Sequence, residues 1–234
     1  MNSKIVVLIP AAGKGKRMDS AVKKPYLVLA DKPVLSHTIE RFEHNSAIDN
    51  IFLIVHKSDF ESCKNIVIEP YNYKKVRGLI PGGETRQESV FNGLSALTDD
   101  VDYVIIHDGV RPFINNEIIT KCLEAAAEWG AAVAAVPVKE TIKFANEDHF
   151  SVQTPNRKLL WRVQTPQVFR KTVIETAHKS AIQEGNGAPD DATLVERLGS
   201  PVKLVMGSYK NIKITTPEDM RFAETIIHNE NVKN

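Results

Sequence analysis

Five cations and two glycines gather near the start of the chain. The sequence IPAAGKGKRM, residues 9–18, follows the apolar run KIVVL, and lysine or arginine occupies positions 14, 16, 17, 23 and 24. A glycine turn after a buried strand presents backbone N–H groups to a ligand, and nearby cations favour an anionic one. The pattern therefore predicts a polyphosphate site, with a solvated turn carrying surface lysines as the ordinary alternative.

The two best-known phosphate motifs do not fit this stretch. The dinucleotide fingerprint G-x-G-x-x-G needs a third glycine, and Met18 occupies that position. A P-loop needs Ser or Thr after its Gly-Lys pair, where this chain has Arg17. A dehydrogenase and a P-loop NTPase are therefore both disfavoured.

Two further stretches carry residues suited to nucleotide chemistry. IHDGVRPF, residues 106–113, ends an apolar run with Asp108 and Arg111, where the Asp can take a ribose hydroxyl or Mg²⁺ and the Arg can grip phosphate. PGGETRQES places Arg86 and Ser89 just after a pair of glycines. A structural Asp–Arg pair and a plain glycine turn are the alternatives. His107 is interpreted as structural, because no Ser or Cys nucleophile motif accompanies it.

Short apolar runs and helical patterns alternate around these motifs. Residues 4–9, 50–55, 102–107 and 131–138 are rich in Val, Ile and Ala, which is typical of strands covered on both faces. Thr85 and Glu88 form a capping-box pattern, Gly130 ends a second helical stretch, and Thr216 precedes Pro217 at the start of a third. The alternation predicts an α/β fold, a three-layer doubly wound and mostly parallel sheet with its ligands beyond the carboxyl ends of the strands.

One segment departs from this alternation. Residues 139–165 alternate apolar and polar side chains around a polar loop, which predicts a β-hairpin arm that protrudes from the sheet. A lone two-stranded arm is marginal in water, so we expect it to pack on a second copy of the chain. Residues 1–234 are otherwise expected to form a single domain.

Composition limits the remaining function classes. The 234 residues include 30 Lys and Arg against 29 Asp and Glu, a formal net charge of +1, so we expect no nucleic-acid partner. No apolar run is long enough for a signal segment or a membrane span, so we expect no membrane association. The two cysteines form no metal-site or disulfide pattern, and we therefore expect a cytoplasmic protein.

Eight motifs in order carry a resemblance to a known family. They are PAAGKGKRM, KKPYL, GGETRQESV, HDGVRP, VPVKETIK, VQTPQVF, DDATLVE and NIKITTPEDM. Together they closely resemble the 2-C-methyl-D-erythritol 4-phosphate cytidylyltransferases of the non-mevalonate isoprenoid pathway. The resemblance implies a Rossmann-like nucleotidyltransferase fold, dimerisation through interlocked β-arms, and Mg²⁺ as cofactor. It also implies that CTP and the polyol phosphate react to give CDP-methylerythritol and pyrophosphate.

The resemblance also implies roles for individual residues. The catalytic cations are matched by Arg17, Lys24, Arg157 and Lys213. Contacts to CTP are matched by Ala11, Ala12, Gly13, Gly15, Gly83, Arg86, Ser89, Asp108 and Gly109, with Asp108 also near a Mg²⁺ held mainly by the CTP phosphates. Contacts to the polyol phosphate are matched by Arg111, Thr141, Arg157, Thr165 and Lys213, with the arm residues donated by the partner subunit.

Two departures from the family pattern keep alternatives open. Pro189 stands where the family commonly has Thr before its acidic pair, which removes a hydroxyl and an N–H donor near the polyol. Gly109 and Val110 stand where alanines are frequent. A cytidylyltransferase for another polyol phosphate, such as ribitol 5-phosphate, therefore remains an alternative, as does a non-catalytic nucleotide-binding regulator.

Overall fold

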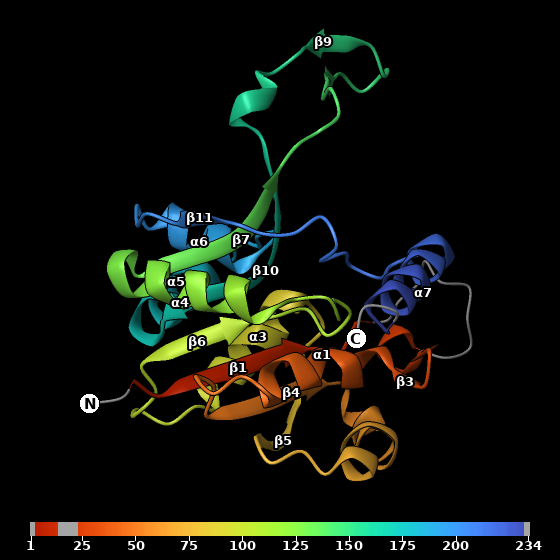
Figure 1. The fold of residues 1–234 in the computed structure, drawn as a ribbon. Coiled ribbons are helices and arrows are strands. Elements are labelled where there is room, and N and C mark those ends of the chain that lie inside the picture. Colours follow the sequence, from red (N-terminus) through yellow and green to blue (C-terminus); the bar gives the residue numbers. More distant parts are fainter. Residues whose placement is uncertain (1–2, 14–22, 232–234) are drawn as a thin grey trace.

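A seven-stranded sheet forms the centre of the molecule (Figure 1). The computed structural model describes residues 3–13 and 23–231. Within them the strand order is β11-β7-β10-β6-β1-β4-β5, and only β10 runs antiparallel to its neighbours. The strands are β1 (Ile5–Pro10), β4 (Asn50–Val55), β5 (Val76–Pro81), β6 (Tyr103–Ile106), β7 (Ala131–Pro137), β10 (Trp161–Arg170) and β11 (Lys203–Met206). The predicted mostly parallel, doubly wound sheet is confirmed.

Helices cover both faces of this sheet because its strands are apolar on both sides. In β1, Val7 and Ile9 face one buried cluster while Val6 and Leu8 face the other. The first cluster is closed by α1 (Val34–Glu43) and α4 (Asn116–Trp129). The second is closed by α3 (Arg86–Ser95), α5 (Lys171–Glu184) and α6 (Asp191–Arg197). Three layers result, as the apolar runs predict.

A smaller apolar cluster lies beside the sheet and involves the last helix. Ala223 and Ile226 of α7 (Pro217–Asn231) pack with Leu29 of β2 (Val28–Leu29), which pairs with β3 (Lys32–Pro33). The short helical segments are η1 (Lys24–Tyr26), η2 (Lys57–Asp59), α2 (Phe60–Cys63), the π-helix η3 (Lys64–Ile68), η4 (Glu69–Tyr71) and η5 (Arg157–Leu159). No helix in the described part of the chain is long and apolar enough to cross a membrane.

The predicted helix ends are present. Thr85 Oγ1 accepts a hydrogen bond from the backbone N–H of Glu88 at 3.1 Å, and Glu88 Oε2 accepts one from the N–H of Thr85 at 3.4 Å, which completes the capping box. Gly130 ends α4 with φ +85°, in the left-handed region that suits glycine. These caps fix the places where the loops near the sheet edge begin and end.

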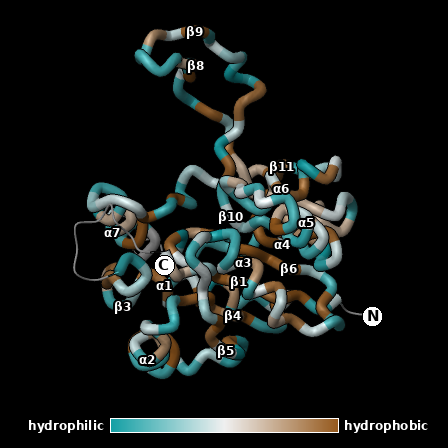
Figure 2. Tube along the Cα trace, turned by 180° about the vertical axis from the view of Figure 1, so that it is seen from behind, coloured by the Kyte–Doolittle hydropathy of each residue, from teal (hydrophilic) through white to brown (hydrophobic). Residues whose placement is uncertain are grey.

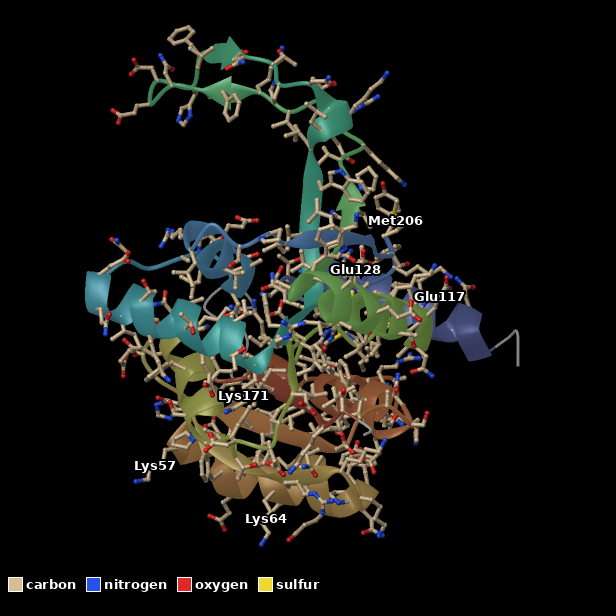
Figure 3. All side chains as sticks on the ribbon, turned by 90° about the vertical axis from the view of Figure 1, so that its left-hand side faces the viewer. Lys57, Lys64, Glu117, Glu128, Lys171 and Met206 are labelled. Atoms are coloured by element: carbon tan, nitrogen blue, oxygen red, sulfur yellow. The ribbon has the colours of Figure 1, made fainter. Side chains whose placement is uncertain are left out.

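Residues 139–160, here called the hairpin, extend away from the sheet (Figures 1 and 2). Within it, β8 (Phe144–Ala145) pairs with β9 (Ser151–Gln153). Phe150, Val152 and Leu159 are 71%, 69% and 77% exposed, and Figure 3 shows the strands β8 and β9 with their side chains standing apart from the central sheet and its helices. Burying these apolar side chains needs a partner surface.

The carboxyl end of this segment lies a few residues before the expected limit of about 165. The expected arm reached residue 165, but β10 begins at Trp161 and lies in the main sheet between β7 and β6. Gln164, Thr165 and Gln167 of β10 are buried polar residues, so the strand lacks the apolar run that marks its neighbours. Alternation alone could not separate a central strand of this kind from the arm that leads into it.

Candidate functional site

Most of the predicted CTP residues line one cavity at the carboxyl ends of β1, β5 and β6. The cavity has a volume of about 260 Å³. Its wall includes Ala11, Ala12, Gly13, Gly83, Arg86 and Ser89, together with Lys24, Asp108 and Lys213. Gly109 lies just outside this wall, where a Cβ would come within 3.0 Å of Leu35 and 3.2 Å of Ala11. Motifs that are far apart in the sequence thus lie together at one cavity of the fold.

A second cavity adjoins the first. Arg111, Thr165 and Pro189 line it, as do the three residues Arg86, Asp108 and Lys213 that also line the first cavity. Two ligands could therefore occupy neighbouring spaces and meet at these shared side chains. Pro189, the departure from the family pattern, borders the second space and not the first.

Asp108 is the electrostatic centre of the shared wall. Its Oδ2 lies 3.1 Å from Nε of Arg111 and 3.0 Å from Nζ of Lys213, and its Oδ1 lies 3.8 Å from Nε of Arg86. Burial alone would raise the pKa of this carboxyl, but the surrounding cations hold it far below its usual range. Asp108 is therefore ionised at neutral pH and keeps the cations in place.

Arg86 joins this centre to residues that the sequence analysis missed. Its Nη1 lies 2.7 Å from Oδ2 of Asp191, and Oδ1 of Asp191 lies 3.1 Å from Nε2 of His178. Burial opposes the charged guanidinium, but Asp191 and Asp108 outweigh it and raise the pKa of Arg86. The acidic pair in DDATLVE was the available signal, since Asp190 caps α6 and leaves Asp191 in its first turn.

Lys24 lines the first cavity, and a residue far from it in the sequence holds its side chain. Its Nζ donates to the backbone carbonyl of Thr215 at 2.6 Å, and the residue is only 8% exposed. The preceding Lys23 makes an ion pair with Asp59 at 2.6 Å, which fixes the chain just before η1. The long Lys24 side chain is therefore directed into the cavity and not into solvent.

Glycines allow the loops of the first cavity to approach one another closely. A Cβ on Gly82 would lie 2.5 Å from Cβ of Ala12, and one on Gly83 would collide with Glu88. The N–H of Gly83 donates to Oγ of Ser89 at 3.0 Å, and this hydroxyl donates to the carbonyl of Thr85 at 2.9 Å. The Ser89 side chain thus fixes the loop at Gly83, and both residues are predicted to contact CTP.

Thr165 lines the second cavity and is bonded to the buried His107 and to the backbone of Asp108. Thr165 Oγ1 accepts from the N–H of Asp108 at 3.0 Å and lies 3.1 Å from Nδ1 of His107. Nε2 of His107 faces the carbonyl of Arg111 at 3.0 Å, so this nitrogen carries the proton and Nδ1 accepts from Thr165. Burial lowers the pKa of His107 to about 4. Both ring nitrogens are used structurally.

Besides Gly109, two predicted residues line neither cavity, and two more fall outside the described residues. Thr141 and Arg157 belong to the hairpin, are exposed, and line neither space; Nη1 of Arg157 donates to the carbonyl of Lys139 at 2.7 Å. Gly15 and Arg17 fall in 14–22, outside the described residues. The roles of these four residues are still predictions.

The described side chains offer little to hold a metal ion on their own. No group of three or more His, Cys, Asp and Glu residues is placed for this among 3–13 and 23–229. Asp108 is the one predicted ligand in the cavity, and its Oδ2 is already paired with two cations. Such a donor set fits a metal that enters with a polyphosphate and takes one carboxylate from the protein.

Comparison with known proteins decides the family. A sequence model of 2-C-methyl-D-erythritol 4-phosphate cytidylyltransferase matches residues 5–229. The chain belongs to this family. A curated cytidylyltransferase of that name from Syntrophotalea carbinolica is 49% identical over 95% of this chain and 96% of its own length. One from Alkaliphilus metalliredigens is 48% identical over 97% and 94%.

Solved structures of this cytidylyltransferase family share the fold. The 4-diphosphocytidyl-2C-methyl-D-erythritol synthase of Anaerococcus prevotii superposes with a TM-score of 0.86 at 34% identity, covering 97% of each chain. The 2-C-methyl-D-erythritol 4-phosphate cytidylyltransferase of Thermus thermophilus gives 0.78 at 32% identity, covering 95% of this chain and 98% of its own. The predicted nucleotidyltransferase fold is confirmed.

Proposed function

We propose that this chain transfers the cytidylyl group of CTP to 2-C-methyl-D-erythritol 4-phosphate, with release of pyrophosphate, in isoprenoid precursor biosynthesis. Membership of the cytidylyltransferase family supports the proposal. The observation that carries it is the pair of adjoining cavities whose common wall is Arg86, Asp108 and Lys213. Two mutually repelling anions need such an arrangement, because each must be held separately and yet react with the other.

CTP occupies the first cavity in this proposal and the polyol phosphate occupies the second. Ala11, Ala12 and Gly13 lie just beyond the carboxyl end of β1. The N–H of Ala11 donates to the carbonyl of Ile54, whereas the N–H groups of Ala12 and Gly13 suit a triphosphate. The polyol phosphate lies against Arg111, Thr165 and Lys213. Its attacking oxygen and the α-phosphorus of CTP then meet beside the shared wall.

The reaction needs no general base. A phosphate monoester has its second pKa near ~6, so at neutral pH it is mostly a dianion and its oxygen is already a nucleophile. This oxygen forms a bond to the α-phosphorus, the bond to the β-phosphate oxygen breaks, and the electron pair leaves with pyrophosphate. His107 has no part in proton transfer, because its ring is buried and both nitrogens are bonded within the fold.

Cations stabilise the charge that grows on the transferred phosphate. Lys24 lies on the nucleotide side and Lys213 on the shared wall. Both can act on the α-phosphate as pyrophosphate departs, because ammonium groups in a partly enclosed site stabilise developing charge more strongly than water does. Arg17 is proposed to assist from residues 14–22.

Mg²⁺ is proposed as the cofactor that accompanies CTP. The triphosphate would supply most of its ligands, and Asp108, which lines the first cavity, would supply a protein carboxylate. When bound, the ion neutralises charge on the phosphates and makes pyrophosphate a better leaving group. Asp108 itself orients Arg111 and Lys213 toward the second cavity.

A homodimer is proposed to complete the second cavity. The hairpin exposes Phe144, Phe150 and Val152, which a second copy would cover. The partner's hairpin would then bring its Thr141 and Arg157 beside the polyol phosphate; in the described part of their own chain these two residues line neither of the two cavities. We propose that the dimer works in the cytoplasm, where CTP is available.

Pyrophosphate release tests the proposed function. The purified chain is incubated with CTP, Mg²⁺ and either methylerythritol phosphate or ribitol 5-phosphate. Release with methylerythritol phosphate alone is expected. Release only with ribitol 5-phosphate would show that the proposed substrate is wrong. Release with neither would indicate a nucleotide-binding protein without this activity. Omission of Mg²⁺ tests the cofactor in the same assay.

A further inference from the structure

Lys213 lies in a segment without helix or strand. Residues 207–216 connect β11 to α7, and local contacts hold them in place. Nδ2 of Asn211 donates to the carbonyl of Thr165 at 2.8 Å, and the N–H of Ile214 donates to the carbonyl of Val110 at 2.9 Å. Lys213 is therefore fixed between two anchored neighbours, and the end of the segment is held by the first turn of α7.

Asp219, in that first turn, holds the end of this segment through hydrogen bonds. Its Oδ2 accepts from the N–H and the hydroxyl of Thr215, both at 2.8 Å, and from the N–H of Thr216 at 2.9 Å. In return its own N–H donates to Oγ1 of Thr216 at 3.3 Å. Burial would raise the pKa of Asp219, but these hydrogen bonds outweigh it and lower the pKa. One carboxylate oxygen thus fixes the turn.

This turn is hydrogen-bonded to one of the two lysines proposed to act in transfer and lies two residues from the other. The carbonyl of Thr215 accepts the hydrogen bond from Nζ of Lys24 at 2.6 Å. Thr215 is also two residues from Lys213, whose Nζ lies 3.0 Å from Oδ2 of Asp108. A shift of the turn would move the acceptor of one lysine and the backbone of the other.

We propose that Asp219 is a positioning residue that sets where the ammonium groups of Lys24 and Lys213 lie. It touches neither cavity and acts through Thr215 and Thr216. Its effect on turnover rests on the proposed function, whereas its effect on the two lysines does not. Both effects can be measured separately.

Glu218 provides a matched control. It is the other acid in the first turn of α7 and its side chain is exposed. Asp219→Ala and Glu218→Ala each remove one negative charge from the same helix N-terminus, so their effects on the helix dipole are similar. Only Asp219→Ala removes the acceptor of the Thr215–Thr216 turn.

Lysine labelling reports the environment of Lys24 and does not require the chain to be enzymatically active. Trace reductive methylation followed by peptide mass spectrometry gives the relative reactivity of Lys24, with the exposed Lys57 as internal reference. Asp219→Ala is expected to raise Lys24 reactivity several-fold, whereas Glu218→Ala leaves it unchanged. Asp219→Asn keeps an oxygen acceptor and is expected to give an intermediate value, and it serves if the alanine variant does not fold. Equal Lys24 reactivity in the wild type and every Asp219 variant would overturn the proposal.

Steady-state kinetics then measure how the Asp219 substitutions change the rate of cytidylyl transfer. A displacement of about 1 Å in positioned groups costs about 100-fold in rate, so Asp219→Ala is expected to lower kcat by 10- to 100-fold with little change in the Kd of CTP. In a Lys24→Ala background the Asp219→Ala substitution should lower kcat by a much smaller factor, because one of the two lysines that Asp219 positions is absent. Full additivity of the two substitutions would contradict the proposal. If the wild type transfers nothing, the proposed function fails while the labelling result still decides the role of Asp219.

Discussion

The ammonium group of Lys213 lies 3.0 Å from Oδ2 of Asp108, although the two residues are far apart in the sequence. The contact places a lysine from the segment before α7 on the carboxylate that lies just beyond β6. Both side chains line both cavities, so a ligand in either space meets the same charges. The two spaces therefore share the charges of this ion pair, together with that of Arg86.

Lys24→Ala tests the cation on the nucleotide side. Loss of one preorganised group that stabilises developing charge costs about 10²- to 10³-fold in kcat, so a fall of that size is expected while the Kd of CTP changes by less than about tenfold. Steady-state kinetics and CTP titration check the two quantities. Lys57→Ala removes an equal charge from the surface, where Figure 3 shows Lys57 pointing away from the body, and should leave both unchanged.

Subunit mixing tests whether the hairpin of one chain serves the site of another. Arg157→Ala and Lys24→Ala chains are each expected to be nearly inactive. After random exchange, half of the dimers are mixed, and one of the two sites in each has both cations, so about a quarter of wild-type activity should return. Activity that stays at the level of the separate variants would show that the sites are not shared through Arg157.

Gly82→Ala tests the close approach of the loops around the first cavity. The added Cβ would lie 2.5 Å from Cβ of Ala12, so the cavity wall must shift. Overpacking of this kind costs about 1–3 kcal/mol, and we expect a lower melting temperature and at least a tenfold weaker CTP binding. Gly187→Ala is the control, since a Cβ there meets nothing within 4 Å.

His107 makes stability depend on pH. Burial lowers the pKa of His107 to about 4, while the unfolded chain titrates near the ordinary value of 6.5. Between these values the unfolded state binds the proton and the folded state does not, so stability falls as the pH drops from 6.5 toward 4, by about 3 kcal/mol in total.

Chemical denaturation at several pH values measures this slope. His107→Asn removes the titrating ring, and its free energy of unfolding should fall less steeply over the same pH range than that of the wild type. Other groups titrate equally in both proteins and cancel in the difference. Parallel curves for the two proteins would assign the slope to those other groups.

Much of the sheet could be predicted because its strands are apolar on both faces. The runs at 4–9, 50–55, 102–107 and 131–138 became β1, β4, β6 and β7, with ends shifted by one residue at most. Strand β10 could not be recognised, since Gln164 and Gln167 are buried through specific partners: Nε2 of Gln164 donates to the carbonyl of Ser208, and Nε2 of Gln167 donates to Oδ2 of Asp190. Polar burial of this kind depends on tertiary contacts that no local pattern encodes.

The candidate site was predictable where a motif comes directly after a strand. Ala12, Gly83 and Asp108 each lie just beyond a strand, and parallel strands bring these positions to one edge of the sheet. Asp191 and Asp219 act through other residues, so their own sequence surroundings indicate only helix starts. Residues that position a site are identified by their contacts, which only the fold reveals.

The product of the reaction tests the central claim most directly. Phosphorus NMR of a mixture of the chain, CTP, Mg²⁺ and methylerythritol phosphate follows every phosphate at once. The proposed function predicts that the monoester signal is lost while the signals of a new diphosphate ester and of pyrophosphate grow in equal amounts. A monoester signal that persists, or that is lost only when ribitol 5-phosphate replaces methylerythritol phosphate, would contradict it.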